Sequence, residues 1–357
     1  MAESTTLRDD LRDAVTPRTA LLVLGVLILQ LGFIWSYAAA FHRPAPDTIP
    51  IAVVAPPSVA PKIVDGLNSI SGKPVHASQA SSLADALTQL RNRDVLGVFV
   101  PSLSGTNDRL IVQSATGPSG ADATTTILTK VDASQHRTLA VTDSIKVIAG
   151  DNRSLTSFYL MIGWAMGGYL AASLLGMSFG SRPANARRLG IRLGALALYA
   201  LVSGVLGVVI VGPMLHALPN VWSAWWLGAL LVFTTGAFST ALSITFGTAG
   251  IGLTFLLFVV LGNPSAGGPY PWALLPPFWK AIGPWIPNGA ALDAIRSLIY
   301  VNGANITRDV LVLIGYAVVG VAVSFLVVAV AKRSIVVLPG DNRELVAPEG
   351  DAAPVTV

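Results

Sequence analysis

The chain has 357 residues, of which 53% are hydrophobic and only 12% are charged, whereas about a quarter of the residues of an ordinary soluble domain are charged. It contains no cysteine, which excludes disulfide scaffolds, thiol catalysis and cysteine-bound metal centres. Its net charge of +4 does not indicate a nucleic-acid-binding surface, so the composition favours an integral membrane protein.

Six apolar stretches predict transmembrane helices. A helix rises about 1.5 Å per residue, so about 20 apolar residues cross a hydrocarbon core of about 30 Å. Helices are the expected form because unpaired backbone groups are costly in lipid. The fourth and fifth stretches are joined by a glycine-rich turn and predict a helical hairpin. The expected spans are residues 21–41, 154–177, 193–215, 222–246, 249–262 and 308–331.

Basic residues predict the orientation, because short cytoplasmic loops are rich in arginine and lysine. The loop 178–192 contains four arginines and no acidic residue, and the last span is followed directly by Lys332 and Arg333. Three more arginines precede the first span. Both termini, including the tail 332–357, are therefore expected in the cytoplasm, and residues 42–153 and 263–307 on the outside.

The first span, 21–41, has a second interpretation. Ala38, Ala39 and Ala40 follow an apolar core, as at a signal-peptidase site. The apolar stretch is long for a signal peptide and a charged segment precedes it. An uncleaved signal anchor is the favoured interpretation, and cleavage is the alternative.

Residues 42–153 predict a small α/β domain inserted between the first two spans. Short apolar runs alternate there with helical patterns, and Ser81 and Ser82 are placed to cap a helix. Strands are expected at 49–55, 75–78, 95–100 and 109–114, and helices at 58–70, 82–93 and 119–148.

Residues 263–300 are apolar but contain seven prolines, which a single transmembrane helix would not tolerate. Two short helices with a break near Gly283 and Pro284 are expected. Three tryptophans suit the membrane interface, where an amphipathic ring is stable. Either an interfacial packing loop or a re-entrant hairpin fits this pattern. The tryptophans are Trp272, Trp279 and Trp285.

The sequence contains no convincing enzyme motif. Gly66–Pro74 has neither the spacing nor the hydroxyl residue of a phosphate-binding loop, and Gly176–Gly180 lies at the end of a membrane helix rather than in a nucleophile elbow. The four histidines lack the spacing of metal ligands. No ionisable residue lies within the apolar core of a span, which argues against an ion-coupled transporter. We expect no catalytic residue, cofactor or metal site, and no nucleic-acid partner.

The whole arrangement resembles the permease subunits of type-2 ABC exporters. It is similar in particular to the phage-infection-protein group of actinobacterial and other bacterial membrane proteins. The most specific pieces are SYAAAFHRPAPDTIPIAVVAP (36–56), SSLADALTQLRNRDVLGVFVPS (81–102) and LGNPSAGGPYPWALLPPFWKAIGPWIPNGAALDAIRSLIY (261–300). The resemblance implies an α-helical integral membrane protein of the bacterial plasma membrane. It would have six transmembrane helices, an inserted extracytoplasmic α/β domain and a re-entrant helical hairpin before the last span.

The resemblance also implies roles on the cytoplasmic side. The loop 178–192 would contact a separate ATPase subunit, although its arginines would equally serve to set the topology. Residues 1–20 would form an amphipathic helix on the inner membrane surface, with apolar residues at helical spacing. The arginines of the contact are Arg182, Arg187 and Arg188, and the apolar residues of the helix are Leu7, Leu11 and Val15.

On the outer side, the resemblance implies that the hairpin forms the gate of the transport path. The gate residues would be Trp272, Trp279, Trp285, Asp293 and Arg296. The last two are three residues apart on one expected helix. A local ion pair, worth a few tenths of a kcal/mol, is favoured over a latch at the gate.

Two functions follow as hypotheses. In the first, the chain is a permease subunit, in a homo- or heterodimer, that moves a hydrophobic or lipid-like envelope molecule outward while a separate subunit hydrolyses ATP. In the second, it is a non-transporting envelope protein whose outer domain binds a cell-wall component, a membrane protein or a phage. Glycines in the second and third spans permit close helix packing, within one chain or between two. They are Gly163, Gly167, Gly168, Gly204 and Gly207.

Overall fold

The computed structural model describes residues 16–151, 153–178 and 183–330. Within them, six helices are long and apolar enough to cross a membrane, so the chain is a multi-pass membrane protein. The fifth continues from α9 through a π-helical stretch and α10, so that it extends over Thr248–Ser265. The six are α2 (Pro17–Phe41), α6 (Thr156–Ser178), α7 (Ala186–Val209), α8 (Trp225–Phe246), α9 (Thr248–Phe255) with α10 (Gly262–Ser265), and α13 (Thr307–Val330).

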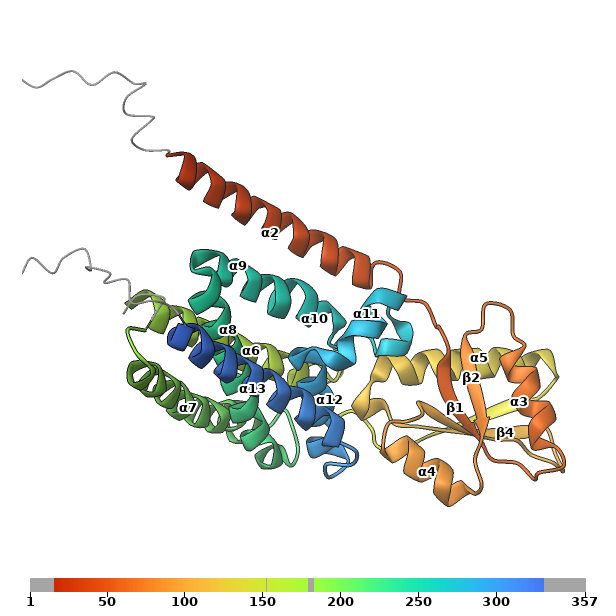
Figure 1. Ribbon diagram of the computed structural model, residues 1–357. Coiled ribbons are helices and arrows are strands. Elements are labelled where there is room, and N and C mark those ends of the chain that lie inside the picture. The colour runs from red at the N-terminus through yellow and green to blue at the C-terminus, as the bar shows by residue number, and fades with distance from the viewer. Residues whose placement is uncertain (1–15, 152, 179–182, 331–357) are drawn as a thin grey trace, which may run out of the picture.

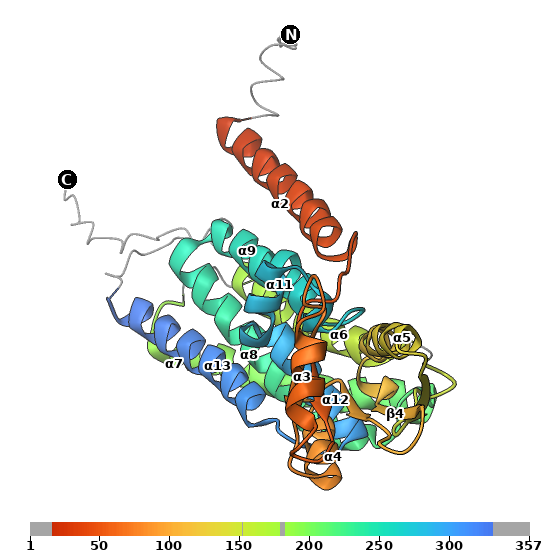
Figure 2. The same ribbon diagram turned by 90° about the vertical axis from the view of Figure 1, so that its right-hand side faces the viewer.

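Helix α8 is the centre of the bundle, and α6, α7 and α13 pack around it (Figure 1). In α8, 72% of the most apolar stretch is buried inside the protein, whereas in α2 the buried share is 6%. Helix α2 stands at the edge and packs along the α9–α10 side (Figures 1 and 2). The start of α2 and the end of α13 lie at the same end of the bundle.

Several of the predicted packing glycines bring helices together within this chain. A Cβ on Gly168 of α6 would lie 2.3 Å from the carbonyl oxygen of Val232 in α8. A Cβ on Gly204 of α7 would lie 2.5 Å from the carbonyl oxygen of Trp225. By contrast, a Cβ on Gly163 would meet no atom within 4 Å. Close approach of α8 to its neighbours therefore depends on the absence of a side chain at Gly168 and Gly204.

Helix α7 begins earlier than residue 193, where the third span was expected. The side chain of Asn185 caps it by accepting a hydrogen bond from the backbone N–H of Arg188 at 2.9 Å. The interhelical loop is therefore shorter than 178–192, and Arg187 and Arg188 belong to the first turn of the helix.

Between α2 and α6 the chain forms a five-stranded sheet in the order β2-β1-β3-β4-β5. Strand β1 is parallel to β2 and β3, β4 is antiparallel to β3, and β5 is parallel to β4. We call residues 49–143 the sheet unit. Its strands are β1 (Ile49–Val53), β2 (Val75–Gln79), β3 (Gly97–Val100), β4 (Asn107–Val112) and β5 (Thr138–Asp143), and its helices α3 (Ala60–Asn68), α4 (Leu83–Arg91) and α5 (Pro118–Ser134).

Helices cover both faces of the sheet because its inner strands are apolar on both sides. Ile49 and Ile51 contribute to a core under α3 and α5, while Ala52 and Val98 contribute to a second core under α4. Ser82 caps α4 as expected, accepting a hydrogen bond from the backbone N–H of Asp85.

The prediction of a single helix over 119–148 is wrong. Helix α5 ends at Ser134, His136 has a φ of 55°, and the chain then turns into the edge strand β5. Strand β5 is mostly exposed, so its sequence lacks a strong apolar pattern. Its position depends on pairing with β4 and on Arg137, which donates hydrogen bonds to the buried carboxylate of Asp108.

This arginine–carboxylate cluster includes Asp132 of α5, which is only 3% exposed. Burial and the neighbouring charge of Asp108 raise the pKa of Asp132 from 3.8 to about 6. Between those two pH values the carboxyl group of Asp132 is ionised in the unfolded chain, whereas it stays protonated in the folded chain. Stability therefore falls as the pH rises through this window, and the full cost is present above about pH 6.

We expect Asp132→Asn to stabilise the sheet unit by about 1–3 kcal/mol at pH 7.5 and to remove the pH dependence between about 4 and 6. The side-chain amide of the introduced asparagine cannot ionise, and its N–H group can still donate a hydrogen bond to Asp108. Hydrogen exchange of the β4 and β5 amides, followed in the full chain from pH 4 to 7.5, measures the effect. Asp122→Asn, at an exposed position of the same helix, is the control. An unchanged pH profile in the Asp132 variant would contradict the assignment.

The segment between α10 and α13, residues 266–306, is called the hairpin below and lies between the bundle and the sheet unit (Figure 1); it begins later than residue 263 because α10 extends the fifth span to Ser265. After α10 it forms a 3-10 turn at Trp272–Leu274, then α11 (Pro277–Ile282), a second 3-10 turn at Gly283–Trp285, and α12 (Pro287–Tyr300). The break between the two main helices falls at the expected glycine–proline pair, where α12 begins with a proline at its first turn.

Candidate functional site

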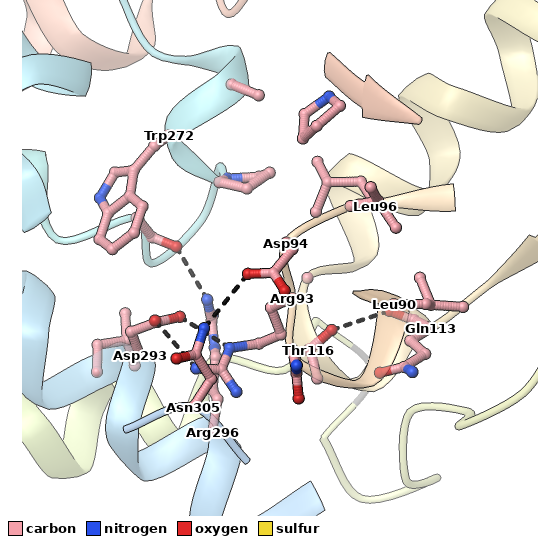
Figure 3. A pocket seen from close by; sticks show the side chains of 18 of the residues that line it. Leu90, Arg93, Asp94, Leu96, Gln113, Thr116, Trp272, Asp293, Arg296 and Asn305 are labelled. Carbon is pink, nitrogen blue, oxygen red and sulfur yellow. Dashed lines mark hydrogen bonds and ion pairs between the residues drawn. The ribbon is translucent and has the colours of Figure 1, made fainter. Parts of the chain in front are cut away.

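A cavity of about 480 Å³ lies where the sheet unit meets the hairpin (Figure 3). Its walls come from the end of α4, the start of α5, the Trp272 turn, α12 and the start of α13. In Figure 3, Leu96 and Gln113 lie on the sheet side, and Trp272 and Asp293 lie on the hairpin side. The charged residues that line it are Arg93, Asp94, Lys280, Asp293, Arg296 and Arg308.

An ion pair between Arg93 and Asp293 joins the two walls. The Nε and Nη2 atoms of Arg93 each donate to one carboxylate oxygen of Asp293, both at 3.0 Å. Arg93 has a φ of 65°, which is unfavourable for a side-chain-bearing residue. Its side chain is only 9% exposed. A bidentate pair of this kind fixes orientation as well as distance, so it holds the sheet unit against the hairpin in one register.

The same carboxylate also accepts a hydrogen bond from Arg308 of α13 at 3.2 Å. Burial alone would raise the pKa of Asp293, but the charges and hydrogen bonds of Arg93, together with Arg308, hold that pKa below its ordinary value. The carboxylate is therefore ionised at neutral pH. The expectation of a local Asp293–Arg296 ion pair is wrong, because Asp293 pairs with arginines from two other elements.

Arg296 instead points its guanidinium at backbone oxygens. It donates to the carbonyls of Gly267 at 3.0 Å, Gly268 at 2.9 Å and Ser154 at 3.2 Å. It is 5% exposed, and burial lowers its pKa to about 10, so it stays protonated at neutral pH. It therefore ties the hairpin to the start of α6, while its Nε has no hydrogen-bond partner among the described residues.

The rim of the cavity near α2 is formed by Lys280 of α11. Its ammonium donates to Asp47 and to the hydroxyl of Thr48, in the segment that connects α2 to β1. Trp272 donates from its indole N–H to the carbonyl of Ser265 at 2.9 Å, and the guanidinium of Arg308 lies 5.4 Å from its ring centre. These contacts hold the Trp272 turn against both α10 and α13.

The sheet wall contributes polar and apolar groups. Gln113 follows β4 and is 8% exposed, and its side-chain oxygen has no partner among the described residues. Thr116 and Gly117 lie at the N-terminus of α5, where the helix dipole is positive. Leu90 and Leu96 supply apolar surface beside them. The cavity can therefore bind a small group that is partly polar and partly apolar.

The structure brings three of the five expected gate residues to the cavity: Trp272, Asp293 and Arg296. Trp279 is 2% exposed and packs against Ala40 at the end of α2, so it is an internal contact rather than an interfacial side chain. Trp285 is 62% exposed and lies outside the cavity lining.

The three arginines expected at the ATPase contact lie elsewhere. Arg187 and Arg188 are exposed on the first turn of α7, at the end of the bundle opposite the sheet unit. Arg182 lies outside the described residues, as do residues 1–15 of the expected amphipathic segment and the tail.

Sequence reasoning missed four residues of the site: Arg93, Gln113, Lys280 and Arg308. Only Arg308 carried a usable local signal, because it and Asp309 are adjacent charges at the start of an apolar span. Arg93 is 200 residues from its partner Asp293, and no local pattern predicts such a contact. In the described part of the chain, no group of three or more His, Asp or Glu residues is placed to hold a metal ion.

Comparison with known proteins identifies no relative. No family model, curated protein or solved structure matches the sequence. A functional assignment therefore depends on the sequence pattern and on the geometry described above.

Proposed function

We propose that the chain is the permease subunit of a type-2 ABC exporter of the bacterial plasma membrane. It would move a hydrophobic or lipid-like envelope molecule outward while a separate subunit hydrolyses ATP. One observation supports this most strongly. Within the described residues, the charged side chains of the six apolar helices lie only in their first two turns, as at Arg187, Arg192 and Arg308. The described part of the bundle between its two ends thus carries no charged side chain and is suited to an uncharged, largely apolar cargo rather than an ion.

The two ends of the bundle would have different roles. The end with Arg187 and Arg188 would face the cytoplasm and contact the ATPase, in agreement with the excess of basic residues there. The opposite end, with the sheet unit, the hairpin and the cavity, would face outward. The six-helix chain would act with a second copy or a related subunit as a dimer, because a six-span permease is commonly half of a transporter in the family that the sequence resembles.

The test of the exporter function is purification of the tagged full chain in mild detergent with mass spectrometry of its partners. We expect a stoichiometric nucleotide-binding subunit. Arg187→Gln/Arg188→Gln is expected to lower its recovery at least about fivefold, because uncharged amides lose the ionic contacts. Lys62→Gln/Lys130→Gln, which removes two exposed charges from the sheet unit, is the matched control and should leave recovery unchanged.

The opposite result would favour the second function. If only envelope proteins accompany the chain in several detergents, and no nucleotide-binding subunit does, the exporter proposal fails. The sheet unit would then be the binding surface of a non-transporting envelope protein.

A further inference from the structure

The cavity between the sheet unit and the hairpin is lined by buried polar groups that are not fully paired by the contacts between these two parts. Gln113 and Arg296 both line it and both are more than nine-tenths buried. Each retains one polar atom without a partner among the described residues, the side-chain oxygen of Gln113 and the Nε of Arg296. Leaving a buried donor or acceptor unpaired costs about 1–3 kcal/mol. Both atoms are covered in the ligand-free structure, so a ligand in the cavity would pair with them, and recover that cost, after a small rotation of each side chain.

The number of cationic side chains without a carboxylate partner indicates which class of ligand the cavity can bind. Four cationic side chains line the cavity, but three of them already bind carboxylates: Arg93 and Arg308 bind Asp293, and Lys280 binds Asp47. Among the described residues, Arg296 keeps an unpaired N–H at its Nε, and the N-terminus of α5 adds backbone donors. A phosphate needs several donors at once and would compete with Asp293 for its arginines. The geometry therefore disfavours an anion.

An uncharged hydroxyl-bearing group meets the demands of both unpaired atoms. A hydroxyl donates one hydrogen bond and accepts others, so it can donate to the oxygen of Gln113 while a second oxygen of the same group accepts from Arg296. Leu90, Leu96 and Leu292 supply apolar wall for the carbon skeleton. Trp272 adds an aromatic surface, and a cavity of about 480 Å³ is within the usual size of small-molecule sites.

We propose that this cavity binds the uncharged, hydroxyl-bearing headgroup, a glycosyl group or similar polyol, of an amphiphilic molecule. The proposal rests on the proposed function insofar as it identifies the amphiphile with the cargo. The cavity lies beside the segment that leaves α2 and beside α10, at the end of the apolar bundle. A headgroup would enter it while the alkyl chain stays among the spans.

The test uses the full chain reconstituted in phosphatidylcholine nanodiscs, with hydrogen exchange of the amides at 113–121 and 290–297 as the readout. Octyl glucoside, added below its micelle-forming concentration, is the probe. Three further compounds are compared with it. Methyl glucoside lacks the alkyl chain and tests whether a soluble sugar is enough. Octylphosphocholine, with the same chain on a zwitterionic phosphate, and inorganic phosphate test whether a phosphate group can replace the sugar. We expect saturable protection by octyl glucoside and none by octylphosphocholine or phosphate.

Three variants, one of them a control, locate the binding. Leu96→Trp fills the cavity with a larger apolar side chain and should abolish the protection, whereas Leu103→Trp, at a position that is 64% exposed and outside the lining, should leave it intact. Gln113→Leu removes the acceptor and should weaken apparent affinity about five- to tenfold. Because it also removes an unpaired buried oxygen, it should not destabilise the ligand-free protein, which its exchange without ligand checks.

The outcomes separate this inference from the proposed function. Equal protection by methyl glucoside would support the hydroxyl chemistry and identify a soluble sugar rather than an amphiphile as its source. Protection by phosphate alone, protection that survives Leu96→Trp, or no protection by any probe would overturn the inference. None of these readouts needs an ATPase subunit, so the binding result stands whether or not such a subunit co-purifies with the chain.

Discussion

Replacing Asp293 with alanine is expected to destabilise the docking of the sheet unit on the hairpin by about 3–5 kcal/mol. The carboxylate is the shared partner of Arg93 and Arg308. Its removal leaves the guanidinium of Arg93, which is only 9% exposed, with no carboxylate at ion-pair distance in the described part of the chain. An unpaired buried charge costs much more than the ion pair contributed, because water cannot replace the lost partner.

Hydrogen exchange of the full chain measures this loss at residues 91–96 and 304–309, where the pair meets. Asp94→Ala is the matched control, because Asp94 is exposed, accepts a hydrogen bond from the amide of Asn305 at 3.3 Å and forms no ion pair with Arg93 among the described residues. It should change stability by no more than about 0.5 kcal/mol. The combined variant Arg93→Met/Asp293→Leu should recover most of the stability, because it replaces the pair with apolar groups. Equal effects of the Asp293 and Asp94 substitutions would contradict a role for the Arg93–Asp293 ion pair in docking the sheet unit.

Replacing Gly168 with alanine is expected to destabilise the bundle by about 2–4 kcal/mol. The new methyl group would lie 2.3 Å from a backbone oxygen of α8 and 2.1 Å from the hydroxyl oxygen of Thr235. A backbone atom in the middle of a packed helix cannot rotate away, so α6 and α8 must separate. The contact between α6 and α8 is a large part of the bundle core, and the loss affects the whole bundle.

Gly163→Ala in the same helix is the control, because a Cβ there meets no atom within 4 Å. Alanine favours a helix more than glycine does, so this variant should be neutral or more stable by up to about 1 kcal/mol. Thermal unfolding of the detergent-solubilised protein compares the two. If both substitutions shift the midpoint equally, then the close approach of α6 to α8 at Gly168 is not what stabilises the bundle.

Much of the architecture follows from local sequence alone. The six spans are predictable because lipid requires each crossing segment to satisfy its own backbone hydrogen bonds, so a long apolar run leaves no alternative to a helix. The break at Gly283–Trp285 is predictable because proline cannot continue a helix. Even the early start of α7 had a local signal in Asn185, a residue type that caps helices.

The missed strand β5 shows where local reasoning ends. Its six residues are largely exposed and follow a helical stretch, so their own preferences were too weak to distinguish strand from helix. The pairing with β4 decides the conformation, because the backbone hydrogen bonds of β5 are made to a strand that lies earlier in the chain.

Hydropathy and proline act within a few residues, so local sequence was enough to predict a membrane protein with six apolar helices, an α/β insertion and a proline-broken segment before the last helix. By contrast, the binding of Arg93 to Asp293 across 200 residues, and the cavity that Gln113 and Arg296 both line, depend on tertiary contacts. Those contacts form between elements far apart in the chain. Their partners are selected by how the sheet unit docks on the hairpin, and no pattern within either segment encodes that docking.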